Sequence, residues 1–468
     1  MSKIKTILTV CNQSTALEMI KQKIADKYIF ICAKKIKQTQ LPSGYIIGKN
    51  VISYSHLSLK RGKYFPKMDW TKVKPLDGTL IIRMRDCEAT TMRMVERIPC
   101  IRKTYETRKK YYYDNLRYWA HVLKYQNVDF FYRCAPPHEG YDNVISGLCD
   151  EFNIPTLYFN PFHPGKAYFA RFINDQMPFI ESEYLLDLNN NNLYDNTKLS
   201  PELNKFFMEH LNKKQPSSLP TIIPRKKIRT QKTLLKRNAS ILKYIDTKAV
   251  IPELRKLKNN YIYVPLQYQY EATTCPMGGP FVDQILLLEI LSRLNIKIYV
   301  KEHPRISKNR SMDYYVKIAG LRNVQFVKRN TNNYDLIDNC LCVASVTGTA
   351  GWEAILRGKQ ALVFGSIYHG YAPGGYFVRN FEDCQNAMKE IKDFKFDEYK
   401  LKVFLFTLEK YLFNHNVVDI VKALKRNIDN ITEFNLLNEM DKPCNCGCSE
   451  LQELPELIES CVEDEENN

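Results

Sequence analysis

The feature that most constrains the fold is an alternation of short apolar runs with helix-length segments between residues 260 and 365. Runs of apolar and β-branched residues are typical of buried strands, and strands that alternate with helices are typical of a parallel sheet. The runs are Tyr261–Leu266, Ile296–Lys301, Val324–Val327, Leu341–Val346 and Ala361–Phe364. In such a sheet ligands bind just beyond the carboxyl ends of the strands, so the turns after these runs are the first candidates for a site.

The first half of the chain carries a weaker version of the same pattern, with strands expected at Ile4–Val10, Tyr28–Cys32, Thr79–Met84, Val128–Tyr132 and Thr156–Phe159. With 468 residues the chain is too long for one ordinary core. The prediction is an α/β protein with two Rossmann-like, doubly wound domains that face a cleft. The expected parts are an N-terminal, acceptor-side domain at 1–175, a basic linker with helices at 176–259, a C-terminal domain at 260–380, helices at 381–435 and a disordered, Cys-containing acidic tail at 436–468.

The net charge of +17 is unevenly distributed along the chain. Residues 225–258 carry twelve Lys or Arg against two acids, whereas residues 450–468 carry eight acids and no base. The simplest interpretation is a solvated linker and an acidic tail. The alternative is attraction of 225–258 to an anionic membrane surface, because each basic residue near such a surface contributes about 1 kcal/mol.

Cysteine usage and apolar runs bear on the compartment. The fourteen cysteines are scattered through expected strands and helices, which indicates reduced thiols. No apolar run approaches the roughly 18 residues that span a bilayer, and the first residues show no signal-peptide cleavage pattern. We expect a cytoplasmic protein, with a peripheral membrane position as the alternative. The CxCxC run at Cys444, Cys446 and Cys448 lacks a fourth zinc ligand nearby, so no metal site is expected.

The turn after Ile296–Lys301 has the sequence EHPR. Because Pro304 disfavours the helical conformation in the residue before it, His303 is expected to be extended, with its imidazole over the edge of the sheet. Lys301 and Arg305 on either side would favour a phosphate or another anion, through charge-assisted hydrogen bonds. The alternative is an ordinary surface or capping histidine.

The turn after Leu341–Val346 has the sequence TGTAGWEA and leads into an expected helix. The free N–H groups and the dipole at the start of a helix attract a phosphate, and small residues allow close approach. Glu353, one turn into this helix, could accept hydrogen bonds from ribose hydroxyls. The alternative is a capped helix packed on the sheet without a ligand. The candidate phosphate ligands are Ser345, Thr347, Gly348 and Thr349.

The turn after Tyr261–Leu266 is long and polar and precedes an expected helix at Phe281–Leu294. Pro280 is typical of a helix start, and two glycines before it leave the backbone N–H groups open to a ligand. The candidate residues for a base or a sugar are Gln267, Gln269, Glu271, Gly278 and Gly279.

Together the three turns describe a phosphate-bearing ligand held by backbone groups and a histidine. No Walker A sequence is present, which argues against a P-loop. No GxGxxG follows the first strand of either half, which disfavours a dinucleotide oxidoreductase.

At these residues the chain resembles the capsular polysaccharide synthesis and export glycosyltransferases, a family that includes transferases using CMP-activated 3-deoxy-octulosonic acid. The resemblance covers residues 261–375 and is carried by PLQYQYEATTCPMGGPFVDQ, YVKEHPR and SVTGTAGWEAILRGKQALVFGSIYHGY. It implies a GT-B architecture without a metal requirement. It also implies that Glu271 lies near the nucleotide or the transferred sugar, and that the nucleotide phosphate is contacted by His303, Pro304, Ser345, Thr347, Gly348 and Thr349.

An inverting transfer would also need a base for the acceptor hydroxyl. Glu139, beside His138 in the turn PPHEGYD, is the candidate, with Asp142 and Asp86 as further carboxylates. His138 and Glu139 could equally cap a helix, and a retaining route would need no such base. On the donor side, His303, Arg305 and the helix start would stabilise the leaving phosphate.

The sequence thus predicts a metal-independent glycosyltransferase that moves a sugar from a nucleotide-activated donor to a glycan or glycolipid acceptor. A CMP donor and an acidic sugar are favoured, the latter because the protein is basic. The nucleotide sugar is a substrate, so no cofactor is expected, and neither is a specific nucleic acid. The alternatives are a nucleotide-sugar 2-epimerase of the same fold and a non-catalytic carbohydrate- or nucleic-acid-binding protein.

Overall fold

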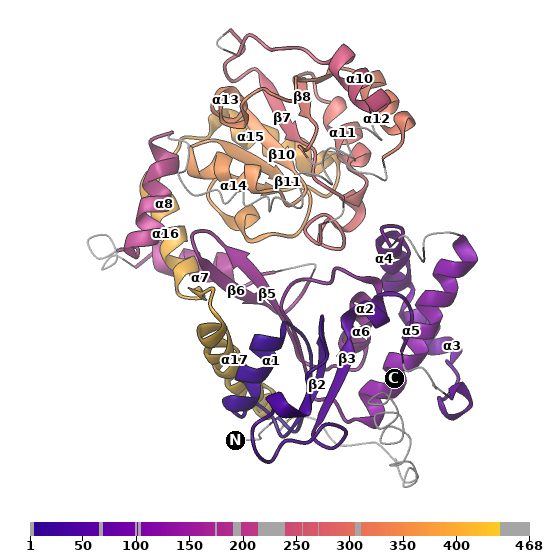
Figure 1. Cartoon of the computed structure of the whole chain (residues 1–468). Helices are drawn as coiled ribbons and strands as arrows, with labels where there is room; N and C mark the ends of the chain where they lie inside the picture. Colours follow the sequence, from indigo (N-terminus) through magenta and orange to yellow (C-terminus); the bar gives the residue numbers. More distant parts are fainter. Residues whose placement is uncertain are drawn as a thin grey trace. The chain divides into compact units, whose positions relative to one another are not determined.

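The computed structural model describes residues 4–64, 69–98, 101, 104–173, 176–190, 198–213, 239–254, 256–269, 271–304 and 310–439, with side chains to residue 430. They form two compact units (Figure 1). Unit 1 comprises Met1–Pro161, Gly165–Arg171 and Phe413–Asn468, and unit 2 comprises Phe162–Pro164 and Phe172–Leu412. The segment expected as a linker, 176–259, falls in unit 2, and the helices expected at 381–435 are divided between the units. Residues 225–238, Arg305 and Cys444, Cys446 and Cys448 lie outside the described residues.

Unit 1 is built on a seven-stranded sheet in the order β13-β6-β5-β4-β1-β2-β3. Its central strands pair in parallel, and the short β13 pairs antiparallel with β6. The order reverses between β1 and β4, because the chain moves outward from β1 first on one side and then on the other. The strands are β1 (Thr6–Val10), β2 (Lys27–Cys32), β3 (Val51–Ser55), β4 (Phe130–Arg133), β5 (Thr156–Phe162), β6 (Lys166–Ala170) and β13 (Phe413–Asn414).

The helices of unit 1 include one segment that the sequence predicted as a strand. The expected strand Thr79–Met84 is wrong, because Asp77 starts a helix there: its carboxylate accepts hydrogen bonds from the N–H groups of Thr79 and Leu80 at 2.8 and 3.0 Å. The C-terminal helix α17 returns to unit 1, where its apolar side chains join the core around β1 and α1. The helices are α1 (Gln13–Lys21), α2 (His56–Lys60), α3 (Gly78–Arg83), α4 (Arg85–Val95), α5 (Tyr105–Tyr125), α6 (Gly140–Glu151) and α17 (Val417–Glu439).

Unit 2 is built on a six-stranded sheet in the order β12-β11-β10-β7-β8-β9, in which every pair is parallel. The five predicted strands are confirmed, and β12 is an additional edge strand. The order reverses between β7 and β10, the position at which ligands bind in sheets of this kind. The strands are β7 (Tyr261–Pro265), β8 (Lys297–Lys301), β9 (Val324–Phe326), β10 (Cys342–Ser345), β11 (Gln360–Val363) and β12 (Gly375–Phe377).

Alternate side chains of the unit 2 strands enter two cores. Tyr261, Tyr263 and Tyr299 pack on one face, whereas Ile262 and Val264 pack on the other, as the period of two in a strand requires. None of the described helices has the length and apolarity to cross a bilayer. The helices of unit 2 are α7 (Ile180–Leu188), α8 (Pro201–Leu211), α10 (Ala239–Lys248), α11 (Gln284–Ser292), α12 (Met312–Gly320), α13 (Asn333–Asn339), α14 (Thr349–Leu356), α15 (Phe381–Asp393) and α16 (Glu398–Glu409).

Candidate functional site

The three turns singled out in the sequence begin at one edge of the unit 2 sheet. Strand β7 lies between β10 and β8, and all three run in the same direction, so their carboxyl ends are neighbours. Gln267 follows β7, His303 follows β8 and Thr347 follows β10. The turns are also joined to one another by hydrogen bonds, which fix their shape.

Gln267 joins the first turn to the third. Its side-chain oxygen accepts a hydrogen bond from the N–H of Thr347 at 3.0 Å, and its Nε2 donates to Thr347 Oγ1 at 3.3 Å. The Thr347 hydroxyl in turn donates to the carbonyl of Thr273. The backbone of Gln267 is held on both sides by the side chain of Gln284, at 2.7 and 3.2 Å. Gln267 and Thr347, predicted as ligand contacts, therefore use much of their hydrogen-bonding capacity on each other.

A buried ion pair, missed in the sequence, anchors the second turn. Nη1 of Arg310 lies 2.9 and 3.1 Å from the two carboxylate oxygens of Glu302, and the two side chains are 1% and 0% exposed. Nη2 of Arg310 donates to the carbonyl of Gln267 at 2.7 Å. One Glu302 oxygen also accepts from the N–H of His303 at 2.9 Å. Arg310 therefore ties the turn after β8 to the turn after β7.

His303 lies at the edge of this assembly. Its imidazole is partly exposed and stacks on Tyr268, with ring centroids 5.6 Å apart at an interplanar angle of 25°. Pro304 is exposed, and Arg305 lies outside the described residues. Lys301, expected beside the histidine, is instead buried, with its ammonium hydrogen-bonded within the segment after β9. The expectation that Lys301 flanks an anion site is therefore wrong.

The third turn leads into α14, which begins at Thr349 as predicted. Gly348 occupies the N-cap position and has no side chain with which to cap the helix. Ser345 is 1% exposed, and its hydroxyl has no hydrogen-bond partner among the described residues. The same holds for Nε2 of His369, which the sequence analysis missed and whose pKa burial lowers to about 3. A Cβ at Gly351 would lie 3.1 Å from both atoms, so only a small residue leaves them room.

The loop between β7 and α11 contains the other predicted contacts. Glu271 is exposed, and Gln269 is partly exposed. The carbonyl of Glu271 accepts hydrogen bonds from two N–H groups later in the loop, which closes a tight turn. A Cβ at Gly278 would lie 2.3 Å from the carbonyl oxygen of Thr274, and Gly279 has a φ of +53°, so the loop requires both glycines for its backbone.

Glu353 of unit 2 has a carboxyl with a perturbed pKa. Burial raises its pKa from 4.5 to about 7, and the charge of Arg357 opposes that rise. Arg357 is engaged elsewhere, because its Nε donates to Asp338 at 2.7 Å. At neutral pH a large fraction of Glu353 is therefore protonated, so the carboxyl can donate a hydrogen bond as well as accept one.

We expect Glu353→Gln to change how stability depends on pH. Folding favours the protonated carboxyl, so its contribution to stability is complete below pH 4.5 and is lost as pH rises through about 7. One pKa unit corresponds to about 1.4 kcal/mol. The free energy of unfolding of the variant should therefore be higher than that of the wild type by at most ~3 kcal/mol at pH 8.5, and the two should differ little at pH 5. Denaturant unfolding at the two pH values checks this, and an equal difference at both would contradict it.

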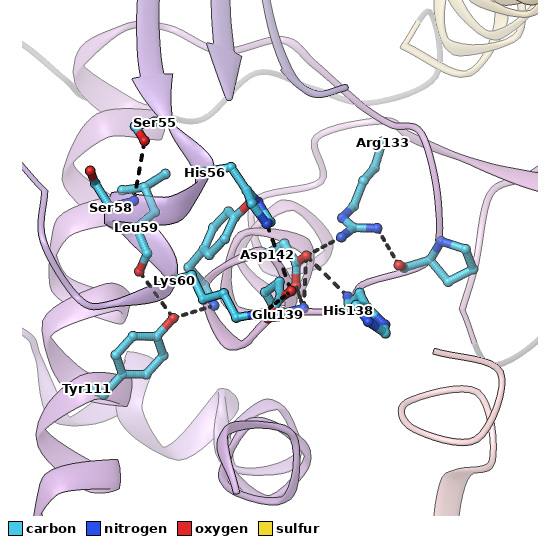
Figure 2. Close-up of polar contacts among 12 residues, drawn as sticks. Ser55, His56, Ser58, Leu59, Lys60, Tyr111, Arg133, His138, Glu139 and Asp142 are labelled. Carbon is cyan, nitrogen blue, oxygen red and sulfur yellow. Dashed lines mark hydrogen bonds and ion pairs between the residues drawn. The ribbon is translucent and has the colours of Figure 1, made fainter. Parts of the chain in front are cut away.

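In unit 1, Glu139 and His138 lie in a cluster of charged side chains at the start of α6 (Figure 2). Lys60 donates to Oε1 of Glu139 at 2.6 Å, and Nε2 of His56 lies 3.9 Å from the same oxygen. Both partners come from α2, which follows β3. Nδ1 of His56 lies 2.6 Å from the hydroxyl of Tyr141. Glu139 is thus an almost buried carboxylate with a cation and an imidazole beside it.

Asp142 has a structural position rather than that of a second base. It is fully buried, its carboxylate pairs with Arg133, and it accepts hydrogen bonds from the N–H groups of His138 and Glu139 at 2.9 to 3.1 Å. Glu139 is the N-cap residue of α6, and Asp142, three residues later, completes a capping box with it, so the expected alternative that Glu139 caps a helix is confirmed. Burial lowers the pKa of His138 to about 4, so that imidazole is neutral at physiological pH. Asp86 is exposed in the first turn of α4.

His56 and Lys60 are the residues of this cluster that sequence reasoning missed. They are four residues apart, so a helix places them on one face, which is a signal that could have been read. The preceding strand β3 was not predicted. Without it, nothing in the sequence indicates that α2 begins at the edge of the sheet. Arg310 carried no comparable signal, because Glu302 is eight residues away and no spacing rule links the two. His369 carried none either, because only the fold brings it to Gly351 of α14.

Cavities and metal-binding groups add little to this description. A hollow of about 900 Å³ opens at the opposite, amino-terminal edge of the unit 2 sheet, where Asn260, Lys297 and Gln360 line it. It is away from the joined turns. Within the described ranges, no group of three or more His, Cys, Asp or Glu side chains is arranged to hold a metal ion.

Comparison with known proteins gives one family match. The family described as "Capsule polysaccharide biosynthesis protein" matches residues 204–404, which include all three turns. No curated protein matches the chain.

Several solved structures are similar at low identity. A β-Kdo 2,7-transferase, KpsC of Thermosulfurimonas dismutans, is 11% identical with a TM-score of 0.35 over 73% of this chain and 96% of that chain. The UDP-GlcNAc 2-epimerase of Methanocaldococcus jannaschii is 10% identical with a TM-score of 0.26 over 92% and 99%. A glycosyltransferase of Rickettsia africae is 11% identical with a TM-score of 0.28 over 93% and 99%.

The family match lies within unit 2 and contains the sequence motifs on which the resemblance was based. The resemblance is thereby confirmed, and it extends over residues 204–404, which match the capsule polysaccharide biosynthesis family.

Proposed function

We propose that the chain is a glycosyltransferase that moves a sugar from a nucleotide-activated donor to a glycan or glycolipid acceptor. The observation that carries the proposal is the joining of three turns at the strand-order reversal of unit 2, within the family-matched segment. This is where a doubly wound sheet binds a nucleotide. The start of α14, which lacks a side-chain cap, leaves N–H groups for a phosphate, and His303 at the edge can donate a further hydrogen bond.

The chemistry requires two kinds of help from the protein. As the bond between the sugar and the nucleotide breaks, negative charge grows on the phosphate, and preorganised donors at α14 and His303 would stabilise it. The attacking hydroxyl must lose a proton, and we assign this role to the Glu139 carboxylate of unit 1, with neutral His138 beside it. The donor we favour is a CMP-linked acidic sugar. The family resemblance favours CMP, and the net charge of +17 favours the acidic sugar. Metal independence and a cytoplasmic location stay predictions.

Nucleotide binding and turnover test this proposal. Unfolding temperatures measured with CMP, UDP and GDP should rise for one nucleotide, because a ligand at 100 times its Kd adds about 2.7 kcal/mol to stability. His303→Ala should reduce that rise. Turnover of CMP- and UDP-sugars, with and without glycan acceptors and EDTA, then identifies the reaction. Acceptor-independent conversion of a UDP-sugar would indicate an epimerase, and no response to any nucleotide would contradict the transferase.

A further inference from the structure

We propose that His56 Nε2 and Glu139 Oε1 together form the subsite that binds the attacking hydroxyl of the acceptor glycan. Lys60 and Tyr141 are the positioning residues. This inference rests on the proposed function and adds the residues that recognise the attacking group. His56 and Lys60 lie on α2, and Glu139 lies at the start of α6 (Figure 2). Tyr141 is in the first turn of α6.

The distances leave room for one bridging oxygen. His56 Nε2 and Glu139 Oε1 are 3.9 Å apart, which is too far for a direct hydrogen bond. An oxygen placed about 2.8 Å from both atoms can donate to the carboxylate and accept from the imidazole, since hydrogen bonds of these types have about that length. A sugar hydroxyl has the one donor and the acceptor lone pairs that this arrangement requires.

Tyr141 decides which histidine nitrogen carries the proton. Its hydroxyl lies 2.6 Å from Nδ1 of His56, and no other contact of this hydroxyl is found among the described residues. If the phenol donates to Nδ1, the proton of the neutral imidazole must sit on Nε2, where it faces the subsite. Burial lowers the pKa of His56, although the charge of Glu139 opposes this, so the neutral form is the one present at physiological pH.

Lys60 holds the carboxylate in place. The Glu139 side chain is 9% exposed, so its charge has lost most of its hydration and requires a partner. The ammonium of Lys60 at 2.6 Å offsets the loss of hydration. Lys60 and His56 are 33% and 26% exposed, so the cluster reaches the surface through α2.

Other charges face the cluster from the neighbouring elements. Arg133 on β4 is neutralised by Asp142 of α6, and Arg97 acts on His138 from beyond the end of α4. Tyr111 of α5 accepts the N–H of Tyr141 at 3.1 Å. Lys60 is therefore the cation that contacts Glu139 directly.

In the proposed step the acceptor O–H bond breaks and a new O–H bond forms on Glu139. The electron pair of the broken bond forms the glycosidic bond, while the sugar–phosphate bond breaks and its pair leaves with the nucleotide. His56 keeps its proton throughout and fixes the position of the attacking oxygen.

The first test is the tautomer of His56, measured by NMR on the full-length chain with ¹⁵N-labelled histidine, assigned with His56→Gln. We expect a protonated Nε2 and an unprotonated Nδ1. Tyr141→Phe, which keeps the buried ring, should shift part of the population to the other tautomer. A protonated Nδ1 in the wild type would overturn the subsite.

The second test measures how the charges of Glu139 and Lys60 affect the titration of His56. Glu139→Gln should lower the midpoint of the His56 titration and Lys60→Met should raise it, each by about half a unit, because Glu139 stabilises the imidazolium and Lys60 opposes it. Lys110→Met, which removes an exposed lysine paired with Asp114 on α5, is the matched control and should leave the titration unchanged. The absence of both shifts would overturn the inference.

The third test uses the nucleotide sugar that turns over in the donor screen. Lys60→Met should lose about tenfold in kcat with KM for the donor unchanged, while Lys60→Arg, which keeps the charge, should retain most activity. Turnover by Lys60→Met at the wild-type kcat, or an equal loss in Lys60→Arg, would overturn the inference and leave the transferase intact. No turnover of any donor would reject the transferase, and the tautomer and the titrations would still decide the geometry of the subsite.

Discussion

Replacement of Arg310 by methionine is expected to lower the free energy of unfolding of unit 2 by about 3–5 kcal/mol. The reason is that Glu302, fully buried, would remain as a charge without its partner, and the carbonyl of Gln267 would lose a donor. Denaturant unfolding of the full-length chain, followed by hydrogen exchange within β7 and β8, measures the effect. The same variant should weaken the response to nucleotides, because Arg310 joins the turn that carries His303 to the turn after β7.

Two further variants separate the effect of the unpaired Glu302 charge from other effects of the substitution. Lys317→Met removes an exposed ion pair with Glu289 in the same unit, at 2.8 Å, and should leave stability nearly unchanged. The double variant Arg310→Met with Glu302→Leu should regain part of the loss, since no isolated charge is left buried. A double variant no more stable than Arg310→Met would show that the hydrogen bonds, rather than the unpaired charge, dominate.

The second large effect is expected in unit 1, where Asp142→Asn should cost about 3–5 kcal/mol. The substitution keeps the shape of the side chain but leaves the guanidinium of Arg133, which is 4% exposed, without a counter-charge. It also weakens the three hydrogen bonds that hold the N–H groups of His138 and Glu139. Thermal and denaturant unfolding of the whole chain provide the measurement.

The matched control in that unit is Asp114→Asn, which removes the same charge from an exposed pair with Lys110 on α5. It should change stability little, because exposed ion pairs contribute little. Similar losses in both aspartate variants would mean that net charge, and not the buried contact, determines the result.

The sheet of unit 2 could be predicted because its strands are buried on both faces and so read as continuous apolar runs, such as Tyr261–Leu266. The meeting of the three turns followed, since parallel strands order their carboxyl ends along one edge. The prediction of a strand at Thr79–Met84 was wrong because an apolar run of that length can form either a strand or a helix. The side chain of Asp77 caps the segment and so favours the helix. Short edge strands such as β12 and β13 carry too few residues to show a period.

The partners inside the sites could not be predicted in the same way. Glu302 and Arg310 are eight residues apart with no spacing rule between them, and Lys60 and Glu139 are brought together only by the sheet. The sequence therefore predicted the sheet edges at which the candidate sites lie. The charged partners of Glu139 and of the turn after β8 could be identified only from the three-dimensional structure.

The return of β13 and α17 to unit 1 has a consequence for dissecting this protein. Unit 2 is inserted in the sequence of unit 1, so no single cleavage of the chain separates the two units. Residues 172–412, a continuous segment, form nearly all of unit 2. A truncation before residue 413 would strip unit 1 of an edge strand and of the apolar side chains that α17 contributes to its core. Isolated expression is thus a reasonable aim for unit 2, whereas unit 1 would need its two ends rejoined.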